Sequence, residues 1–270
     1  LQVSCLDSAN ADAIARWEAF VAAIPGATFF HRAAWQPIIR EVFSHRTWFL
    51  YAERDGLIEG VLPLAQIDSR LFGNSLVALP FAVYGGVVAN GEDAAVALED
   101  EAERIAQERG VEHLEYRNIT ARHPDWPRQD LYVTFRKEIL PDEESNMLAI
   151  PRKQRAMVRK SFKHGLRSEI DPDATRFFAL YADNVRRHGT PALPKRYFDT
   201  LLQIFGKDCE VMTVVDAAGV PVSSVLSFYF RDEILPYYAG DAERARELAA
   251  NDFKYWELLR RSCARGIKVF

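Results

Sequence analysis

Residues 221–270 decide the fold of this 270-residue chain: PVSSVLSFYF (221–230), RDE (231–233), ILPYYAG (234–240), DAERARELAA (241–250) and NDFKYWELLRRSCARGIKVF (251–270). Two runs rich in β-branched and aromatic residues flank a short polar turn, which predicts an antiparallel hairpin. A helix is expected over 251–265, where apolar residues recur at helical spacing, and Gly266 leads from it into a further strand, IKVF. This order of elements predicts an α+β unit.

The same series of elements is expected twice along the chain. Upstream of the hairpin, helices are predicted over 174–188 and 195–205 and a strand over 209–216. In the first half, helices are predicted over 11–24, 31–43 and 92–109, a hairpin turn over 54–56, and extended segments over 76–89 and 111–118. The repetition predicts two duplicated units, one over 1–147 and a second over 148–270.

The composition is that of an ordinary globular protein, with 49% hydrophobic and 27% charged residues and a formal net charge of -4. No apolar run approaches the roughly 20 residues of a membrane-spanning helix and no signal pattern opens the chain, so a cytoplasmic protein is expected. Three scattered cysteines without CxxC or Cys/His spacing predict neither a disulfide framework nor a metal site. The GxGxxG, GxxxxGK[ST], HExxH and GxSxG motifs are absent from the sequence, so a Rossmann cofactor, a P-loop, a zincin and an α/β-hydrolase have no support.

A strongly basic segment opens the second unit. IPRKQRAMVRKSFKHGLR (150–167) holds seven Lys or Arg and no acidic residue, and it predicts a helix over 151–164 that ends at Gly165. The basic side chains fall on one side of this helix, whereas Ile150, Met157, Val158, Phe162 and Leu166 form the other side. A solvated face is one interpretation. The other interpretation is a face that binds an anion, because no acidic partner lies three or four residues away. The anion would be a substrate phosphate, an RNA backbone or an anionic membrane surface.

Polar and aromatic residues surround the loop between the last predicted strand and the last helix. Asn251 or Asp252 is expected to cap that helix, and helix N-termini that follow strands are anion sites. Tyr238 and Tyr255 flank the loop in the sequence, although core packing explains such aromatics equally well.

Two further candidates lie elsewhere. His188 ends the predicted 174–188 helix, where it is either a proton acceptor or a cation favoured by the helix dipole. The pair Gly85-Gly86 follows Tyr84 and allows the backbone to approach a ligand closely, or else forms a bend.

Four stretches carry a family resemblance: AIPRKQRAMVRKSFKHGL (149–166), FFALYADNVRRHGTPALPKRYFDTLLQIFG (177–206), PVSSVLSFYFRDEILPYYAGD (221–241) and ANDFKYWELLRRSCARGIKVF (250–270). With them the chain resembles the FemAB-related acyltransferases, in particular the group associated with exopolysaccharide and PEP-CTERM sorting systems in Gram-negative bacteria. The resemblance implies tandem units of the GCN5-related N-acetyltransferase (GNAT) type, each a mixed, mostly antiparallel sheet flanked by helices.

The sequence departs from this family pattern at two points. The loop ARELAAND (245–252) lacks the glycines with which ordinary acetyltransferases hold the pyrophosphate of coenzyme A. The family pattern also continues beyond KVF (268–270), so the second unit is expected to be incomplete at its C-terminus.

The resemblance implies transfer of an aminoacyl or acyl group to an amine of a cell-envelope or exopolysaccharide precursor. The donor would be aminoacyl-tRNA or acyl-CoA, without a tightly bound cofactor, and the acceptor would be phosphorylated or linked to a nucleotide or lipid. Contacts with tRNA and peripheral contact with the inner face of the membrane stay open, whereas DNA is not an expected partner. The alternative is a catalytically degenerate binding protein of polysaccharide export or protein sorting, which the glycine-free loop favours.

Direct attack of an amine on an activated carbonyl needs positioning, a proton acceptor and oxyanion stabilisation, but no covalent nucleophile. The expected catalytic residues are Tyr238 as the oxyanion donor and His188 or Asp241 as the proton acceptor. The expected substrate-binding residues are Arg152, Arg155, Arg159, Lys160, Gly240, Asn251, Asp252, Tyr255 and Tyr84.

Overall fold

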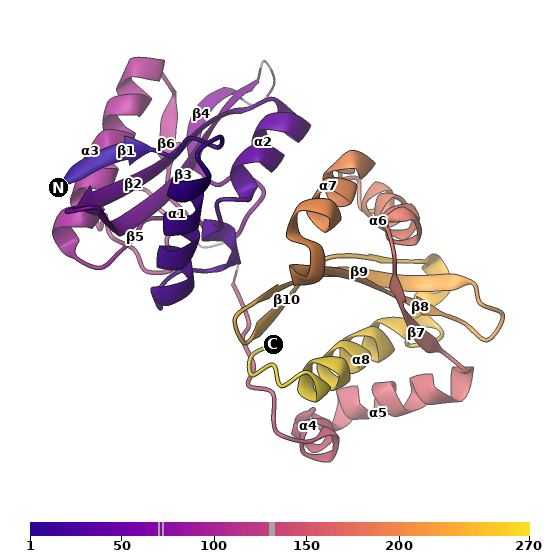
Figure 1. The fold of residues 1–270 in the computed structure, drawn as a ribbon. Coiled ribbons are helices and arrows are strands. Elements are labelled where there is room, and N and C mark those ends of the chain that lie inside the picture. The colour runs from indigo at the N-terminus through magenta and orange to yellow at the C-terminus, as the bar shows by residue number, and fades with distance from the viewer. Residues whose placement is uncertain (70, 72, 130–132) are drawn as a thin grey trace. The chain divides into compact units, whose positions relative to one another are not determined.

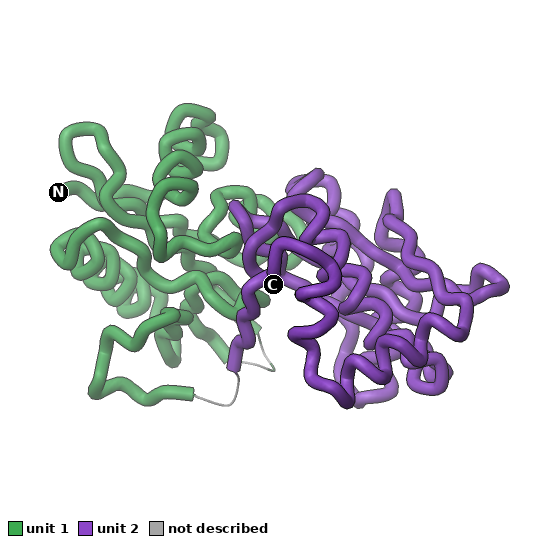
Figure 2. Tube along the Cα trace, turned by 90° about the horizontal axis from the view of Figure 1, so that it is seen from below, with its two compact units in different colours: residues 1–129 green, residues 130–270 purple. Residues whose placement is uncertain are grey.

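The computed structural model describes residues 1–69, 71, 73–129 and 133–270, which form two compact units, Leu1–Gln129 and Asp130–Phe270 (Figures 1 and 2). The division lies earlier than the predicted one between residues 147 and 148. Its cause is a long-range backbone pairing: Lys137 and Phe270 exchange two N–H···O bonds of 2.8 Å, and Ile139 donates to the Lys268 carbonyl at 2.8 Å. Ile139 is also buried in the core of the second unit. The segment that precedes residue 148 therefore belongs to the second unit.

The first unit is a sheet with helices on both faces. Its elements are β1 (Gln2–Cys5), α1 (Ala11–Ala23), η1 (Phe29–His31), α2 (Trp35–Phe43), β2 (Arg46–Arg54), β3 (Leu57–Ser69), β4 (Gly73–Ala78), β5 (Val88–Ala89), α3 (Glu92–Arg109) and β6 (His113–Glu115). The strand order is β1-β2-β3-β4-β6, with β5 paired to β3. The β4–β6 pair is parallel and the other pairs are antiparallel, so this sheet is mixed and mostly antiparallel, as expected.

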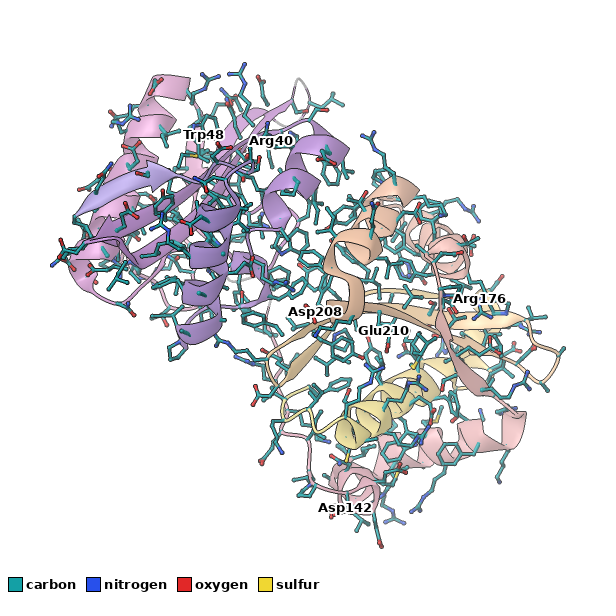
Figure 3. All side chains as sticks on the ribbon, in the orientation of Figure 1. Arg40, Trp48, Asp142, Arg176, Asp208 and Glu210 are labelled. Atoms are coloured by element: carbon teal, nitrogen blue, oxygen red, sulfur yellow. The ribbon has the colours of Figure 1, made fainter. Side chains whose placement is uncertain are left out.

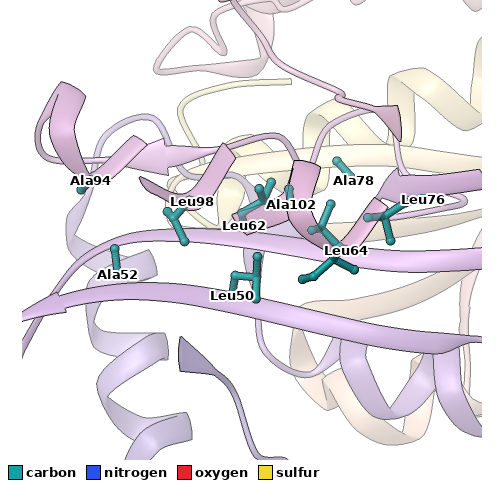
Figure 4. Packing of buried hydrophobic residues seen from close by; sticks show 10 residues of the cluster. Leu50, Ala52, Leu62, Leu64, Leu76, Ala78, Ala94, Leu98 and Ala102 are labelled. Atoms are coloured by element: carbon teal, nitrogen blue, oxygen red, sulfur yellow. The ribbon is translucent and has the colours of Figure 1, made fainter. Parts of the chain in front are cut away.

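Strand alternation builds the core of the first unit. Leu50 and Leu62 pack with Leu98 of α3 on one face of the sheet (Figure 4). Phe49, the neighbour of Leu50 in β2, points to the other face, where its ring lies 5.7 Å from the ring of Trp17 in α1. The period of two therefore supplies each helix layer with its own set of apolar side chains.

The second unit has the same architecture. Its elements are α4 (Glu143–Ala149), α5 (Arg152–Ser161), η2 (Phe162–His164), β7 (Arg167–Asp171), α6 (Thr175–Arg187), α7 (Lys195–Phe205), η3 (Gly206–Asp208), β8 (Cys209–Val215), β9 (Pro221–Phe230), β10 (Glu233–Asp241), η4 (Glu243–Arg246) and α8 (Ala250–Ala264). The strand order is β10-β9-β8-β7, and all three pairs are antiparallel. Val269 adds isolated bridges to Glu138 and Glu233, and so the expected IKVF strand is reduced to bridges at Val269.

Helices cover both faces of the second sheet (Figure 1). On one face, α6 and α7 pack their aromatic rings against β10, and Arg176 of α6 bonds the carboxylates of Glu169 and Asp171 in β7 (Figure 3). On the other face, Val225 of β9 lies in one cluster with Trp256 of α8 and Val158 of α5. The expected α+β class is confirmed for both units.

No helix among the residues that the structure describes has the length and apolarity needed to cross a membrane.

Candidate functional site

The junction between β10 and α8 is the candidate site. β10 ends at Asp241, η4 follows, and α8 starts at Ala250. Ala249 has φ 51°, a left-handed conformation that glycine adopts at little cost and alanine adopts rarely. The backbone thus makes a turn of the glycine type without a glycine. The first N–H groups of α8 have no intrahelical acceptor, and they favour negative charge at this point.

The predicted caps of α8 are wrong. The N-cap residue is Ala249, and it makes no side-chain hydrogen bond. Asn251 and Asp252 lie within the first turn, because the helix begins one residue before the predicted start. Asn251 is exposed, and partial burial raises the pKa of Asp252.

Asp241 is held in position through one carboxylate oxygen. Its Oδ1 accepts from the Ser223 hydroxyl and from the Lys254 ammonium, the latter at 3.0 Å. Its Oδ2 has no hydrogen-bond partner among the residues that the structure describes, and 32% of the side chain is exposed. Asp241 therefore presents a free carboxylate oxygen to a donor such as an amine.

Lys254 is a site residue that sequence reasoning missed. Its side chain is 0% exposed and its one ion pair in the described structure is with Asp241. Burial lowers the pKa of Lys254, and the charge and hydrogen bond of Asp241 oppose that shift. The signal was present in the sequence: Lys254 lies four residues from both Ala250 and Leu258, on the buried stripe of α8.

Tyr255 joins this group from the exposed side of α8. The Lys254 Nζ lies 5.2 Å from the centre of the Tyr255 ring. Burial raises the pKa of the Tyr255 phenol, and the charge of Asp241 raises it further. The structure thus brings together Asp241, Lys254 and Tyr255.

His188 follows the helix that reaches the end of β10. Arg187, the last residue of α6, donates to the Asp241 backbone carbonyl. His188 is exposed, and its Nδ1 lies 2.7 Å from the Asn184 carbonyl oxygen. Because a carbonyl only accepts, Nδ1 carries the proton of the neutral ring and Nε2 is the free acceptor.

Tyr238 and Gly240 lie on the opposite face of the sheet from the Asp241 carboxylate. The Tyr238 hydroxyl is 3.2 Å from that of Tyr197, and burial raises the Tyr238 pKa well above its ordinary value. A Cβ on Gly240 would lie 2.3 Å from the backbone nitrogen of Tyr181, so α6 occupies the space that was expected for a ligand. The structure therefore does not bring Tyr238 and Gly240 together with the Asp241 side chain.

The basic helix is α5, as expected, and Gly165 ends it with φ 63° after a short 3₁₀ turn. An open hollow of about 390 Å³ lies along its outer surface, lined by Arg152, Arg155, Ala156, Arg159, Lys160 and Lys163. The C-terminal end of the basic helix lies beside the first turn of α8, since the rings of Phe162 and Phe253 are 6.2 Å apart. Phe162 was expected on the packed side, yet it is 48% exposed.

Tyr84 belongs to the first unit and lies half-buried in the loop between β4 and β5. Polar side chains hold this loop: the Gly86 carbonyl oxygen lies 2.9 Å from His31 Nε2, and Asn118 accepts from the Val87 N–H at 3.2 Å. A Cβ on Gly86 would meet the Asn118 side-chain oxygen at 1.8 Å, so packing within the unit already requires this glycine.

Comparisons with known proteins concern the fold of the chain. Residues 152–270 match the family described as "Acetyltransferase (GNAT) domain". The fold is similar to the crystal structure of FemX, with 13% identity over 100% of this chain and 87% of that chain and a TM-score of 0.73. It is also similar to a tandem GNAT protein from the clavulanic acid biosynthesis pathway, with 12% identity, coverage of 99% and 88%, and a TM-score of 0.57.

A third similar structure is L-PGS from Bacillus licheniformis, with 15% identity, coverage of 97% of this chain and 77% of that chain, and a TM-score of 0.51. A search of curated proteins finds no match. The chain therefore has the tandem GNAT fold, and its second unit matches the acetyltransferase (GNAT) domain.

Proposed function

We propose that this chain is an N-acyltransferase that transfers an aminoacyl or acyl group from an activated ester or thioester to an amine. The proposal rests on the match of residues 152–270 to an acetyltransferase domain. It places the reaction at the β10–α8 junction, where Asp241 carries a free carboxylate oxygen beside the first turn of α8.

In this mechanism the acceptor amine donates a hydrogen bond to Asp241 Oδ2, while Ser223 and Lys254 fix Oδ1. The amine nitrogen attacks the carbonyl carbon, and N–H groups of the first turn of α8 stabilise the developing oxyanion. The amine proton passes to Asp241 or to the free Nε2 of His188. Collapse of the tetrahedral intermediate forms the amide and expels a thiolate or a ribose alkoxide, which takes up a proton to become the free thiol or hydroxyl.

The donor would be acyl-CoA or aminoacyl-tRNA. The left-handed Ala249 supports a phosphate site without glycine, because the backbone already turns there. Arg152, Arg155, Arg159 and Lys160 would bind anionic groups along α5, and Asn251, Asp252 and Tyr255 would line the first turns of α8. Tyr238 takes no part in this mechanism, because its hydroxyl lies under α6 and α7.

The acceptor would be an amine of a cell-envelope or exopolysaccharide precursor at the inner face of the cytoplasmic membrane. The resemblance of the sequence to FemAB-related acyltransferases supports this class of acceptor. The fold that the chain shares with FemX and with L-PGS supports it as well. Tyr84 lies in the first unit, and its role as a substrate contact stays a prediction from the sequence.

Thermal unfolding with each donor tests the proposal. A donor at about 100 times its Kd stabilises the folded state by about 2.7 kcal/mol, so either acetyl-CoA or a charged tRNA should raise Tm by several degrees. Asp241→Asn should keep this shift but lose most transfer to a simple amine, whereas Asp232→Asn, at an exposed position, should keep both. If neither donor raises Tm, acyl transfer is the wrong function.

The glycine-free loop between β10 and α8 favours a second candidate, a degenerate binding protein of polysaccharide export or protein sorting. This candidate predicts that anionic partners bind α5 while no donor shifts Tm and Asp241→Asn has no effect on that binding.

A further inference from the structure

The outer face of α5 carries positive charge that no described residue neutralises. We call Arg152, Lys153, Arg155, Arg159, Lys160 and Lys163 the cationic surface. Among the described residues, the Arg155 side chain bonds only the Leu148 carbonyl oxygen, at 3.1 Å, and the other five side chains form neither an ion pair nor a hydrogen bond. Arg104 on the exposed side of α3 differs, because it pairs with both Glu101 and Glu108 at 2.8 Å. The cationic surface therefore suits an external anion.

Apolar side chains flank the cationic surface. Phe162 is 48% exposed at the C-terminal end of α5, and Leu148 is 60% exposed next to Arg155. The inner side of the helix is not available for binding, because Val158 is buried against α8 and the sheet. What a partner meets is thus a row of cations about 17 Å long, at 1.5 Å per residue, with an exposed apolar group beside it at either end.

We propose that the cationic surface docks the second unit onto an anionic lipid bilayer. Lipid phosphates would contact the six cations, while Phe162 and Leu148 enter the interfacial layer between head groups and acyl chains. Mobile lipids can arrange themselves along a row of fixed cations. An RNA backbone would leave the exposed Leu148 side chain without an apolar partner, which is why the membrane is the favoured class.

Docking in this way deepens the proposed function. Phe162 and Lys163 lie in η2, directly after α5, and the Phe162 ring packs beside Phe253 in the first turn of α8. The candidate site would therefore lie near the bilayer surface, where a lipid-linked amine would be found. The inference rests on the anion-binding role proposed for α5, but not on acyl transfer itself.

Co-sedimentation with vesicles tests the docking without any donor or acceptor. Vesicles with about one-third phosphatidylglycerol in phosphatidylcholine should bind the chain at about 0.1 M salt, and binding should weaken strongly at about 0.5 M salt. Arg159→Glu/Lys160→Glu should lower the partition coefficient by about thirtyfold or more, since each basic residue contributes about 1 kcal/mol near such a surface. Phe162→Ala should lower it about fivefold through the lost apolar contact.

The matched control is Lys207→Glu/Lys268→Glu, which makes the same change in net charge at two exposed positions away from α5. This control should change the partition coefficient less than twofold. The contribution of about 1 kcal/mol applies only to basic residues close to the membrane surface. An equal loss in this control would overturn the proposal, because net charge would then explain the binding.

Three other results would also overturn the membrane assignment. The first is no binding of the wild-type chain to anionic vesicles, and the second is release from them by inorganic phosphate at constant ionic strength. The third is tight binding of bulk tRNA that Arg159→Glu/Lys160→Glu abolishes, with no binding to vesicles. Failure of acyl transfer is separate: donors would fail to shift Tm while vesicle binding stayed intact.

Discussion

The buried ion pair between Lys254 and Asp241 gives the sharpest test of the site. Asp241→Ala removes the one counter-charge that the described residues supply to the Lys254 ammonium group, which is 0% exposed. Breaking a buried pair by removing one partner costs about 3–5 kcal/mol, because the remaining charge has neither water nor a counter-ion. We expect the free energy of unfolding of the second unit to fall by that amount.

Lys254→Met should behave differently. It removes the buried charge and keeps most of the side-chain volume, while Asp241 keeps the Ser223 donor and its contact with water. The expected cost is below about 1 kcal/mol, since replacing a buried charge by an apolar group of similar size is often neutral. The double variant Asp241→Ala/Lys254→Met has no unpaired ammonium. The stability of this double variant should therefore lie close to that of Lys254→Met alone. The coupling energy of this cycle would be about 3 kcal/mol.

Hydrogen exchange of the β9 and β10 amides measures these losses within the second unit. The pH dependence gives an independent check. The pKa of Lys254 lies below its ordinary value of 10.5. Between the pKa of Lys254 in the folded state and the ordinary value, the unfolded chain binds more protons than the folded chain. The free energy of unfolding therefore rises with pH in this window, and Lys254→Met should abolish the rise. Equal costs for the two single variants, or additive costs in the double variant, would refute the reasoning.

Three further predictions concern packing and reactivity. Gly240→Ala should destabilise the second unit by more than about 3 kcal/mol in urea unfolding, because its Cβ would lie 2.3 Å from the Tyr181 nitrogen; a cost below about 1 kcal/mol would contradict this contact. Leu62→Ala should cost about 2–5 kcal/mol in the first unit and leave exchange in the second unchanged. In native protein a thiol reagent should modify the exposed Cys5 much faster than Cys209, since burial raises the Cys209 pKa strongly; Cys5→Ser should remove the fast phase.

Local sequence signals predicted some elements but not others: the helix predicted over 31–43 begins only at Trp35, and β1, α4 and β7 were not predicted. The bounds of α7 and β9 agree with the prediction, because proline precedes or begins each element and apolar periodicity fills it. The helical segment formed by α5 and η2 ends at Gly165 as predicted, since glycine takes the left-handed conformation there at no steric cost. The start of α8 was displaced by one residue, because a left-handed alanine precedes the helix and gives no capping signal.

The candidate site was only partly predictable. Asp241 lies at the predicted junction, but Tyr238 is three positions away along the same strand, and alternation sends the two side chains to opposite faces. Lys254 was missed because a lysine on an apolar stripe resembles an ordinary polar substitution until its burial is known. The unit boundary depends on pairing between residues 137–139 and 268–270, which no local pattern reveals.

That pairing has a consequence for synthesis on the ribosome. Every strand pair of the first unit joins residues between 2 and 115, so its sheet can form while the second unit is still being made. The second unit cannot complete its core in this way, because Lys137 must wait for a partner that is translated more than 120 residues later. Its aromatic strands would stay exposed in the meantime, and a nascent chain of this protein should need chaperone protection between the folding of the two units.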